Sequence, residues 1–353
     1  MALKYLIVGS GYRSEYYGRI AKAWPKLFNA RYLVRSQEKA ALIKAHTGCE
    51  ACTDLKSALA FGPDFAVVAV DRGHNAQVIS QFVSLGLPVA AETPLGCDME
   101  SLKALWNLHE KGKKIVSLEQ YPRHPVLAEG LSAVARGVIG TPQTAYLSLM
   151  HDYHAASLLR HMLLTGHEEY SMRGVRTSFA AAETDSRYGA IRDGKYALRE
   201  RDMAHITYES GKTAVYDFSP VQYRSFIRSR HLSVRGSRGE WSDTVILHLD
   251  EDGLPARTFL MAELPKKYQS LDSQALRDLR KIRSEELFLD TCHDEYAIAT
   301  MLLDMGDWLN GGEPPCPLWE SLDDAVFWLC REETVRRPWE EIISPKTPWS
   351  DPG

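Results

Sequence analysis

The stretch KYLIVGSGYR, residues 4–13, joins an apolar run to two glycines spaced one residue apart. The run is typical of a buried strand, and residues 14–24 continue with apolar side chains at helical spacing. At the start of such a helix, backbone N–H groups and the helix dipole attract a pyrophosphate, and side chains at Gly9 and Gly11 would obstruct it. A glycine turn alone can be structural, but a strand before it and a helix after it favour a dinucleotide-binding unit.

Apolar runs and helical patterns go on alternating through the first third of the chain. Further strands are expected at residues 30–34, 65–70, 88–91 and 114–119, with helices at residues 37–46, 75–85 and 99–111. Alternation of this kind predicts a parallel sheet with helices on both faces.

The pattern changes near residue 121. Period-two strands are expected at residues 143–150, 203–208, 213–218, 231–235 and 243–248, helices at 125–136, 293–309 and 322–330, and a charged helix or loop at 266–283. A chain of 353 residues exceeds the size at which one hydrophobic core usually stops growing. We therefore predict an α/β protein with a Rossmann-type domain over residues 1–121 and an α+β domain with a large, mainly antiparallel sheet over residues 122–353.

Composition excludes several classes of protein. A hydrophobic content of 44% and a charged content of 25% are ordinary for a soluble globular chain, and the net charge of -4 argues against a nucleic-acid groove. No apolar run is long enough to span a membrane and no leader precedes the first strand, so a cytoplasmic location is expected. Six cysteines are too sparse for a disulfide framework, and the lone pair Cys49 and Cys52 is interpreted as structural, so no metal site is predicted.

The second predicted strand ends in Val34-Arg35-Ser36, where an acidic residue normally binds the adenosine ribose. An arginine beside a hydroxyl suits a 2′-phosphate, which favours NADP. Arg35 could instead stack on the adenine of NAD. The sequence therefore predicts NAD or NADP as cofactor.

Five motifs together resemble one enzyme family. They are Gly9-x-Gly11-x-Arg13, Ala69-Val70-Asp71, the segment GLPVAAETPL at residues 86–95, Gly137-x-x-Gly140, and Asp152-Tyr153-His154 ahead of a leucine-rich helix ending at Gly166. The chain resembles the glucose-fructose oxidoreductase, inositol dehydrogenase and rhizopine catabolism (Gfo/Idh/MocA) family over essentially its whole length. From this resemblance and the strand ends, we expect cofactor contacts from Gly9, Gly11, Tyr12, Arg13, Arg35, Ser36, Val70, Asp71, Glu92, Thr93, Pro94 and Glu119.

The chain departs from the family at the catalytic lysine. In the family, a Glu-Lys-Pro motif places that lysine beside the nicotinamide and the reacting hydroxyl. Here Glu92 and Pro94 match, but Thr93 stands at the lysine position. Since a threonine hydroxyl cannot take a proton near neutral pH, another residue has to act as the acid or base.

Residues 151–154, His-Asp-Tyr-His, are four consecutive ionisable side chains in the part of the second predicted domain that is expected to face the first domain's sheet. His154 matches the family's catalytic histidine, and an imidazole suits proton transfer near neutral pH, so we predict it as the acid/base. In an extended segment, Asp152 would share the face of His154 and orient it. In a turn, Tyr153 would reach the substrate instead.

Weaker candidates lie nearby. Glu119 and Tyr121 close the last strand of the first domain, where ligands of open α/β sheets bind. Tyr223, in the second domain, could hold a substrate hydroxyl. His161 and His167 are interpreted as structural.

The resemblance implies a nicotinamide-dependent oxidoreductase that transfers a hydride to or from a secondary alcohol of a sugar, polyol or glycoside. An alternative is an NAD-dependent glycosidase whose cycle of oxidation, elimination and hydration is redox-neutral, and another is a non-catalytic dinucleotide sensor. The expected partners are a small sugar-like substrate and further copies of the chain, in a dimer or tetramer.

Overall fold

The structure, a computed structural model, describes residues 2–186, 189–261, 266–271 and 292–350. The chain divides into two units, one holding residues 1–124 and 264–322 and the other holding residues 125–263 and 323–352. From the sequence, the domain boundary is predicted after residue 121, which assigns residues 264–322 to the second domain. In the structure, the described part of this segment returns to the first unit.

The first unit is built on a six-stranded sheet in the order β3-β2-β1-β4-β5-β6. The strands are β1 (Leu3–Val8), β2 (Phe28–Leu33), β3 (Glu50–Cys52), β4 (Phe65–Val68), β5 (Val89–Ala91) and β6 (Ile115–Ser117). Every neighbouring pair is parallel, which confirms the predicted Rossmann-type sheet. The strand order reverses between β1 and β4, and ligands of open α/β sheets bind at the carboxyl ends beside such a point.

The helices of the first unit are α1 (Tyr12–Ala23), α2 (Gln37–Thr47), α3 (Leu55–Ala60), α4 (Arg72–Ser84), α5 (Met99–Glu110) and α9 (Cys292–Leu309), with 3-10 turns η1 (Tyr121–Arg123) and η3 (Lys266–Tyr268). A charged helix or loop is expected from the sequence at residues 266–283. The structure has the short turn η3 at its start, and residues 272–283 lie outside the described residues.

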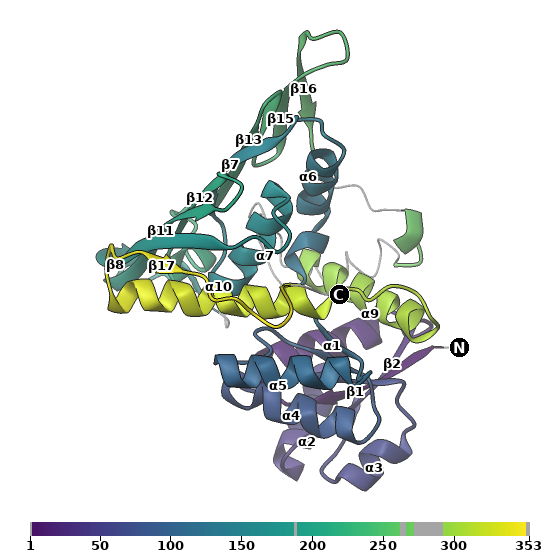
Figure 1. Ribbon diagram of the computed structural model, residues 1–353. Coiled ribbons are helices and arrows are strands. Elements are labelled where there is room, and N and C mark those ends of the chain that lie inside the picture. Colours follow the sequence, from purple (N-terminus) through teal and green to yellow (C-terminus); the bar gives the residue numbers. More distant parts are fainter. Residues whose placement is uncertain (1, 187–188, 262–265, 272–291, 351–353) are drawn as a thin grey trace. The chain divides into compact units, whose positions relative to one another are not determined.

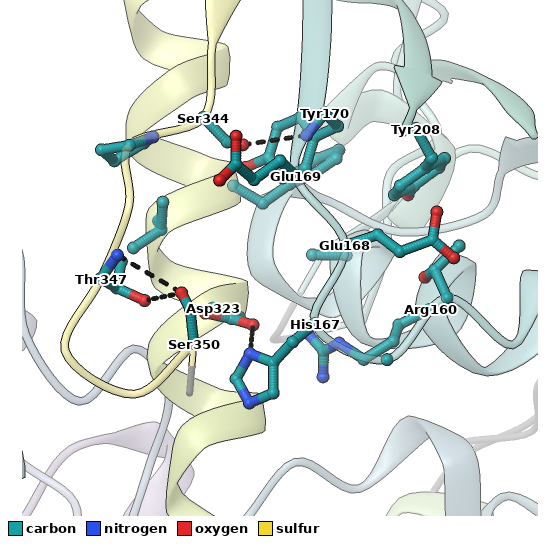
Figure 2. Close-up of a pocket in the computed structure, with 16 residues that line it drawn as sticks. Arg160, His167, Glu168, Glu169, Tyr170, Tyr208, Asp323, Ser344, Thr347 and Ser350 are labelled. Atoms are coloured by element: carbon teal, nitrogen blue, oxygen red, sulfur yellow. Dashed lines mark hydrogen bonds and ion pairs between the residues drawn. The ribbon is translucent and has the colours of Figure 1, made fainter. Parts of the chain in front are cut away.

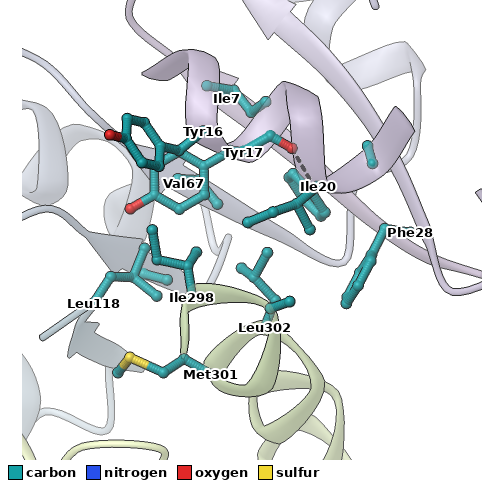
Figure 3. Close-up of a cluster of buried hydrophobic side chains, with 14 of the residues drawn as sticks. Ile7, Tyr16, Tyr17, Ile20, Phe28, Val67, Leu118, Ile298, Met301 and Leu302 are labelled. Carbon is teal, nitrogen blue, oxygen red and sulfur yellow. Dashed lines mark hydrogen bonds between the residues drawn. The ribbon is translucent and has the colours of Figure 1, made fainter. Parts of the chain in front are cut away.

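A buried apolar cluster joins α9 to the amino-terminal part of the first unit. Tyr17 and Ile20 of α1 pack in the same cluster as Ile298 and Leu302 of α9, and all four side chains are inaccessible to solvent (Figure 3). Burial of this kind is worth roughly 1.5–3 kcal/mol for each large side chain. This contact explains why α9 belongs to the first unit.

The second unit is built on a nine-stranded sheet in the order β16-β15-β14-β13-β7-β12-β11-β8-β17. The strands are β7 (Pro142–Ser148), β8 (Tyr170–Ala182), β11 (Tyr196–Tyr208), β12 (Thr213–Phe218), β13 (His231–Gly236), β14 (Gly239–Ser242), β15 (Val245–Leu249), β16 (Pro255–Phe259) and β17 (Ile342–Ile343), beside a small pair, β9 (Asp185–Ser186) and β10 (Gly189–Ala190). Only β7 and β12 are parallel neighbours in the nine-stranded sheet. The predicted large, mainly antiparallel sheet is confirmed.

Helices α6 (Pro125–Ala135) and α7 (Asp152–Leu163) lie on one face of the nine-stranded sheet (Figure 1). The unit also contains the 3-10 turn η2 (Pro220–Tyr223) and most of α10 (Leu318–Arg336), which is shared between the units at Leu322. Ten of the twelve residues of α7 are buried. Within the described parts of the chain, the helices are all too short or too polar to cross a lipid bilayer.

Candidate functional site

The cofactor residues predicted from sequence lie at one edge of the six-stranded sheet. They follow the carboxyl ends of β1 (Gly9 and Gly11), β2 (Arg35 and Ser36), β4 (Val70 and Asp71), β5 (Glu92, Thr93 and Pro94) and β6 (Glu119). Since parallel strands end at the same edge, the topology brings together segments that are more than 100 residues apart in sequence.

The two glycines of the first turn are required for different reasons. Gly9 has a φ of +132°, and a β-carbon there would lie 2.2 Å from the carbonyl oxygen of Ala69, at the end of β4. Gly9 is therefore needed by the fold itself. Gly11 has an ordinary φ of -84°, and a β-carbon on it would meet nothing within 4 Å. Glycine at this position leaves room beside the helix terminus without being required by packing.

The N-terminus of α1 differs from those of its neighbours. Helices α2, α3, α4 and α5 are capped by the side chains of Ser36, Asp54, Asp71 and Asp98, each accepting a backbone N–H. Within the described residues, no side chain caps α1, whose N-cap is Gly11. A helix N-terminus with no side chain on its N-cap residue fits the pyrophosphate of a dinucleotide, which the helix dipole attracts.

Arg13, predicted to contact the cofactor, is paired inside the first unit. Its Nε donates to Oε1 of Glu92 at 3.0 Å, and its guanidinium also reaches Oδ2 of Asp294 at 3.4 Å. Burial lowers the pKa of Arg13, but these two carboxylates raise it by a larger amount. The resulting pKa is well above the ordinary value. Tyr12, beside it, is hydrogen-bonded through its hydroxyl to that of Tyr16 at 2.9 Å. Arg13 therefore ties the end of β5 to α1 and α9.

The segment after β5 is held from two sides. Asn75 donates its amide to the carbonyl oxygens of Glu92 at 2.6 Å and Pro94 at 2.8 Å, and the hydroxyl of Tyr17 donates to Glu92 Oε1 at 2.5 Å. Thr93 Oγ1 is buried and has no hydrogen-bond partner among the described residues. Buried hydroxyls are nearly always bonded, so an atom of this kind fits a bond to a ligand.

Four candidates at the ends of β2 and β4 remain, and two of them are used as helix caps. Ser36 accepts the N–H of Lys39 at 3.3 Å and Asp71 accepts that of Gly73 at 3.0 Å, so both are helix caps. Arg35 is exposed and Val70 is half-buried at the edge of the sheet. Of these four, Arg35 has the side chain suited to an adenosine phosphate.

Glu119 is the most strongly perturbed acid at this edge. Its side chain is buried, and burial, together with the carboxylate of Glu92, raises its pKa to about 8. The N–H of Tyr121 donates to its Oε1 at 3.2 Å. Tyr121 in turn stacks on His124, with 5.1 Å between ring centroids.

His124 extends the buried network to α9. Its Nε2 lies 2.9 Å from Oδ1 of Asp294, the carboxylate that also binds Arg13. Sequence analysis missed both His124 and Asp294. Asp294 stands in the first turn of α9, 170 residues after His124, and no local pattern connects the two.

In the second unit, residues 151–154 form the start of α7. His151 is the N-cap and Asp152 begins the helix, with a φ of +44°. The segment is therefore not extended, and the arrangement in which Asp152 would orient His154 is not observed. Asp152 instead accepts from Nε of Arg331 at 2.8 Å, an ion pair with one of the most buried arginines of the unit. Burial raises the pKa of Asp152, although Arg331 opposes the shift.

Four aromatic or imidazole side chains meet at this helix terminus. The ring of His154 lies 4.8 Å from that of His151 and 4.6 Å from that of Tyr153, between centroids. His151 is hydrogen-bonded through Nδ1 to the Tyr223 hydroxyl at 2.8 Å and through Nε2 to the Tyr153 hydroxyl at 3.1 Å. The structure thus brings the predicted His154 and Tyr153 together with Tyr223, a weaker candidate 70 residues away.

The two histidines interpreted as structural have local partners. His161 Nδ1 lies 2.8 Å from the carbonyl oxygen of Ser157, and His167 Nδ1 lies 2.9 Å from Oδ2 of Asp323. His167 borders a cavity of about 50 Å³ at the opposite end of α7 from His154, and its ring points toward Asp323 (Figure 2). None of the residues predicted for cofactor or catalysis lines this cavity.

The cysteine pair is held within the first unit. Cys49 Sγ donates to the carbonyl oxygen of Gly18 at 3.7 Å and Cys52 Sγ to that of Tyr32 at 3.3 Å. Burial raises the pKa of both thiols, which favours their protonated form.

Comparison with known proteins finds a family match in the amino-terminal part of the first unit. Residues 3–120 match the GFO_IDH_MocA family model, described as oxidoreductase family, NAD-binding Rossmann fold. No curated protein matches the chain.

Solved structures share the fold over nearly the whole chain. An oxidoreductase domain protein from Kribbella flavida is 13% identical, with a TM-score of 0.73 and coverage of 98% of this chain and 100% of its own. An oxidoreductase from Agrobacterium radiobacter in complex with NAD+, L-tartaric acid and magnesium is 12% identical, with a TM-score of 0.69 and coverages of 97% and 98%. The WlbA dehydrogenase from Chromobactrium violaceum in complex with NADH and UDP-GlcNAcA is 12% identical, with a TM-score of 0.65 and coverages of 98% and 97%. At these identities the likeness is one of fold.

Proposed function

We propose that the protein transfers a hydride between NAD and a secondary alcohol of a sugar, polyol or glycoside, because residues 3–120 match the family model of the Gfo/Idh/MocA oxidoreductases with an NAD-binding Rossmann fold. The observation that carries the proposal is the open N-terminus of α1, where Gly11 replaces the side-chain cap of the neighbouring helices. A pyrophosphate at this terminus would accept the amides that capping residues bind elsewhere.

The residues at the sheet edge suit the other parts of the cofactor. In the proposed complex, Thr93 Oγ1 donates a hydrogen bond to the nicotinamide half, and Arg35 lies beside the adenosine ribose. When bound, the nicotinamide accepts or returns the hydride. Arg13 and Asn75 keep the Glu92–Pro94 segment in place, through the bonds described above, so that the hydroxyl of Thr93 has a defined position.

The proton that accompanies the hydride requires a base other than Thr93. We assign it to His154, because an imidazole is the side chain best suited to proton exchange near neutral pH. Tyr153 is the second candidate, because its ring contacts that of His154. Asp152 is not assigned a catalytic role, since its carboxylate is bound to Arg331.

Titration calorimetry with NAD+ and NADP+, followed by a turnover screen, tests this function. We expect micromolar binding of at least one nucleotide, and an Arg35→Ala variant that loses affinity for NADP+ but not for NAD+. For turnover, the nicotinamide absorbance band is followed with polyols, aldonic acids, tartrate and UDP-sugars, since the relatives in complex with ligands hold tartaric acid and a UDP-sugar acid. Absence of binding to both nucleotides would contradict the proposal.

The same screen separates the alternatives. A dehydrogenase changes the nicotinamide absorbance in proportion to product, whereas a redox-neutral glycosidase releases sugar from a glycoside with no net change. A sensor binds the nucleotide without turnover of any probe. We also propose a dimer or tetramer, which light scattering coupled to gel filtration measures directly.

Thr93→Lys tests whether the site works without the lysine. We expect no gain in turnover, because the proton is assigned to His154 and Oγ1 of Thr93 is buried, with little room for a longer side chain. A clear increase in kcat in Thr93→Lys would show that the missing lysine limits the reaction.

A further inference from the structure

We propose that Tyr153, His151 and Tyr223 form a proton relay that carries the reaction proton from His154 to solvent. The inference rests on the proposed function, because it assumes that His154 takes up a proton in each turnover. It concerns the three residues beside His154, and it assigns a role to Tyr223, which stands in η2 and outside the helix that carries the other members.

A relay is needed because the predicted base is enclosed. His154 is 7% exposed and Tyr153 is 9% exposed, whereas His151 and Tyr223 are both half-buried. A base with so little access to water has to pass its proton through neighbouring groups before it can act again. The rings of Tyr153 and His151 pack against the ring of His154, and in the proposed route the proton passes to these side chains.

The hydrogen bonds of His151 allow a proton to pass in either direction. A neutral imidazole has one N–H donor and one bare nitrogen, while each phenol can both donate and accept. In one arrangement Tyr153 donates to Nε2 while Nδ1–H donates to Tyr223. In the other, Tyr223 donates to Nδ1 while Nε2–H donates to Tyr153. Both arrangements keep the bonds of 3.1 Å and 2.8 Å intact.

The backbone fixes the outer end of the relay. The N–H of His151 also donates to the Tyr223 oxygen, at 3.1 Å. Because a backbone N–H can only donate, this bond holds the phenol in reach of the imidazole whichever way the protons point. Phe218 packs on the Tyr223 ring at 4.9 Å, and Arg230 lies 5.8 Å from its centroid, where a cation favours negative charge on the phenol.

The transfers balance in protons. During oxidation, His154 takes the hydroxyl proton and gives a proton to the Tyr153 oxygen, and Tyr153 gives its own proton to His151 Nε2. His151 then gives up the proton on Nδ1 to Tyr223, whose hydroxyl proton leaves to water. Reduction runs the same steps in reverse. No electrons move in the relay, and each member ends with as many protons as it began with.

Tyr223→Phe breaks the outer end of the relay and keeps its packing. With NAD+ and whichever probe alcohol turns over, we expect kcat to fall by about tenfold with KM unchanged, and added imidazole buffer to restore much of it. Tyr146→Phe is the matched control, because it removes a hydroxyl bound to Asp217 at 3.1 Å in the same sheet, outside the relay. Normal kcat in Tyr223→Phe, or loss without rescue by buffer, would overturn the proposal.

His151→Gln tests the centre. An amide can hydrogen-bond to both phenols but cannot pass a proton between them, so the variant should lose as much kcat as Tyr223→Phe. Since both changes interrupt one route, the double variant should be no slower than His151→Gln alone. Independent, multiplying losses would count against a shared route.

Nitrogen NMR of the His151 ring decides the relay without turnover. In the wild type we expect exchange-averaged shifts for Nδ1 and Nε2, with a single tautomer in Tyr153→Phe and in Tyr223→Phe. One fixed tautomer in all three proteins would refute the relay even if the chain is a dehydrogenase. Averaged shifts that collapse in both variants would support it even if none of the probe alcohols reacts, in which case the proposed substrate class fails by itself.

Discussion

Helices α1 and α7 begin in similar ways and differ in what surrounds their first turns. Each has 12 residues, follows the end of a strand, and lacks a side-chain cap among the described residues. At α1 the N-cap is Gly11, beside open space. At α7 two tyrosine hydroxyls accept the first amides, Tyr223 from His151 at 3.1 Å and Tyr216 from Asp152 at 3.2 Å.

The difference shows how one local architecture serves two kinds of chemistry. The start of α1 offers amides and a dipole, which recognise an anion and hold no proton to exchange. At the start of α7 the first amides are bonded by protein hydroxyls, and imidazole and phenol groups, which are able to exchange protons, lie beside them. On the proposed function, nucleotide affinity depends on the first terminus and proton transfer on the second.

His154→Ala should give the largest effect, because it removes the acid/base at the α7 terminus. We expect kcat to fall by about 10²-fold or more, with nucleotide affinity unchanged. His161→Ala is the control, since it lies on the same helix and its ring bonds the Ser157 carbonyl. A near-normal rate in His154→Ala would remove this residue from the mechanism and break the comparison.

Gly11→Asp turns the α1 terminus into a conventional cap. The new carboxylate would accept the helix amides, stabilising the helix by a few tenths of a kcal/mol, and would repel the pyrophosphate. We therefore expect NAD affinity to fall by roughly tenfold while thermal stability is kept. Calorimetry and a melting curve measure the two effects, and unchanged affinity would show that the pyrophosphate does not lie at this terminus.

Gly9→Ala separates folding from binding in the same turn. Its β-carbon would lie 2.2 Å from the Ala69 carbonyl, in a backbone conformation that side chains rarely adopt. We expect a loss of roughly 1–3 kcal/mol in unfolding free energy, measured in urea. Gly11→Ala, with open space around its β-carbon, should unfold like the wild type.

The first sheet was predictable because its strands carry a strong local signal. β4 is buried along all four residues and reads as a continuous apolar run, so both its existence and its parallel neighbours follow from the sequence. β8 was missed although it has 13 residues, because Arg173, Gly174 and Arg176 interrupt its apolar alternation. Arg176 is compensated by Asp202 on β11, at 2.6 Å, a pairing that appears only once the sheet is formed.

The candidate sites show the same limit. The glycine turn and the residues 151–154 are contiguous, and both could be found from local spacing. Asp294 and Arg331 reach their partners from helices near the end of the chain, and nothing in their local sequence marks them. The sequence could not show that Asp152 pairs with Arg331, because Arg331 lies 179 residues away.

Glu119 is a buried acid in the first unit, and it makes the stability of the folded protein depend on pH. Its folded pKa is raised from 4.5 to about 8, so the folded state keeps a proton that the unfolded chain loses. Its contribution to stability is full below about pH 4.5 and is lost as the pH rises through 8. Glu119→Gln should therefore flatten the fall in melting temperature between pH 5 and 8.5, by a few degrees. The exposed Glu110→Gln should leave that fall unchanged, and equal slopes in all three proteins would contradict the burial argument.

Thr93→Val should have the smallest effect, and it tests whether the cofactor is bound by Thr93 in addition to the α1 terminus. The exchange keeps the shape of the side chain and removes a buried hydroxyl that has no partner among the described residues. The unliganded protein should be as stable as the wild type or slightly more stable, because no internal hydrogen bond is lost. If Oγ1 bonds the cofactor, NAD affinity should fall by about two- to tenfold, the value of one neutral hydrogen bond. Thr93→Ser, which keeps the hydroxyl, is the control and should retain affinity. A valine variant that binds NAD as tightly as the serine variant would place Thr93 outside the cofactor site, leaving the α1 terminus as its main anchor.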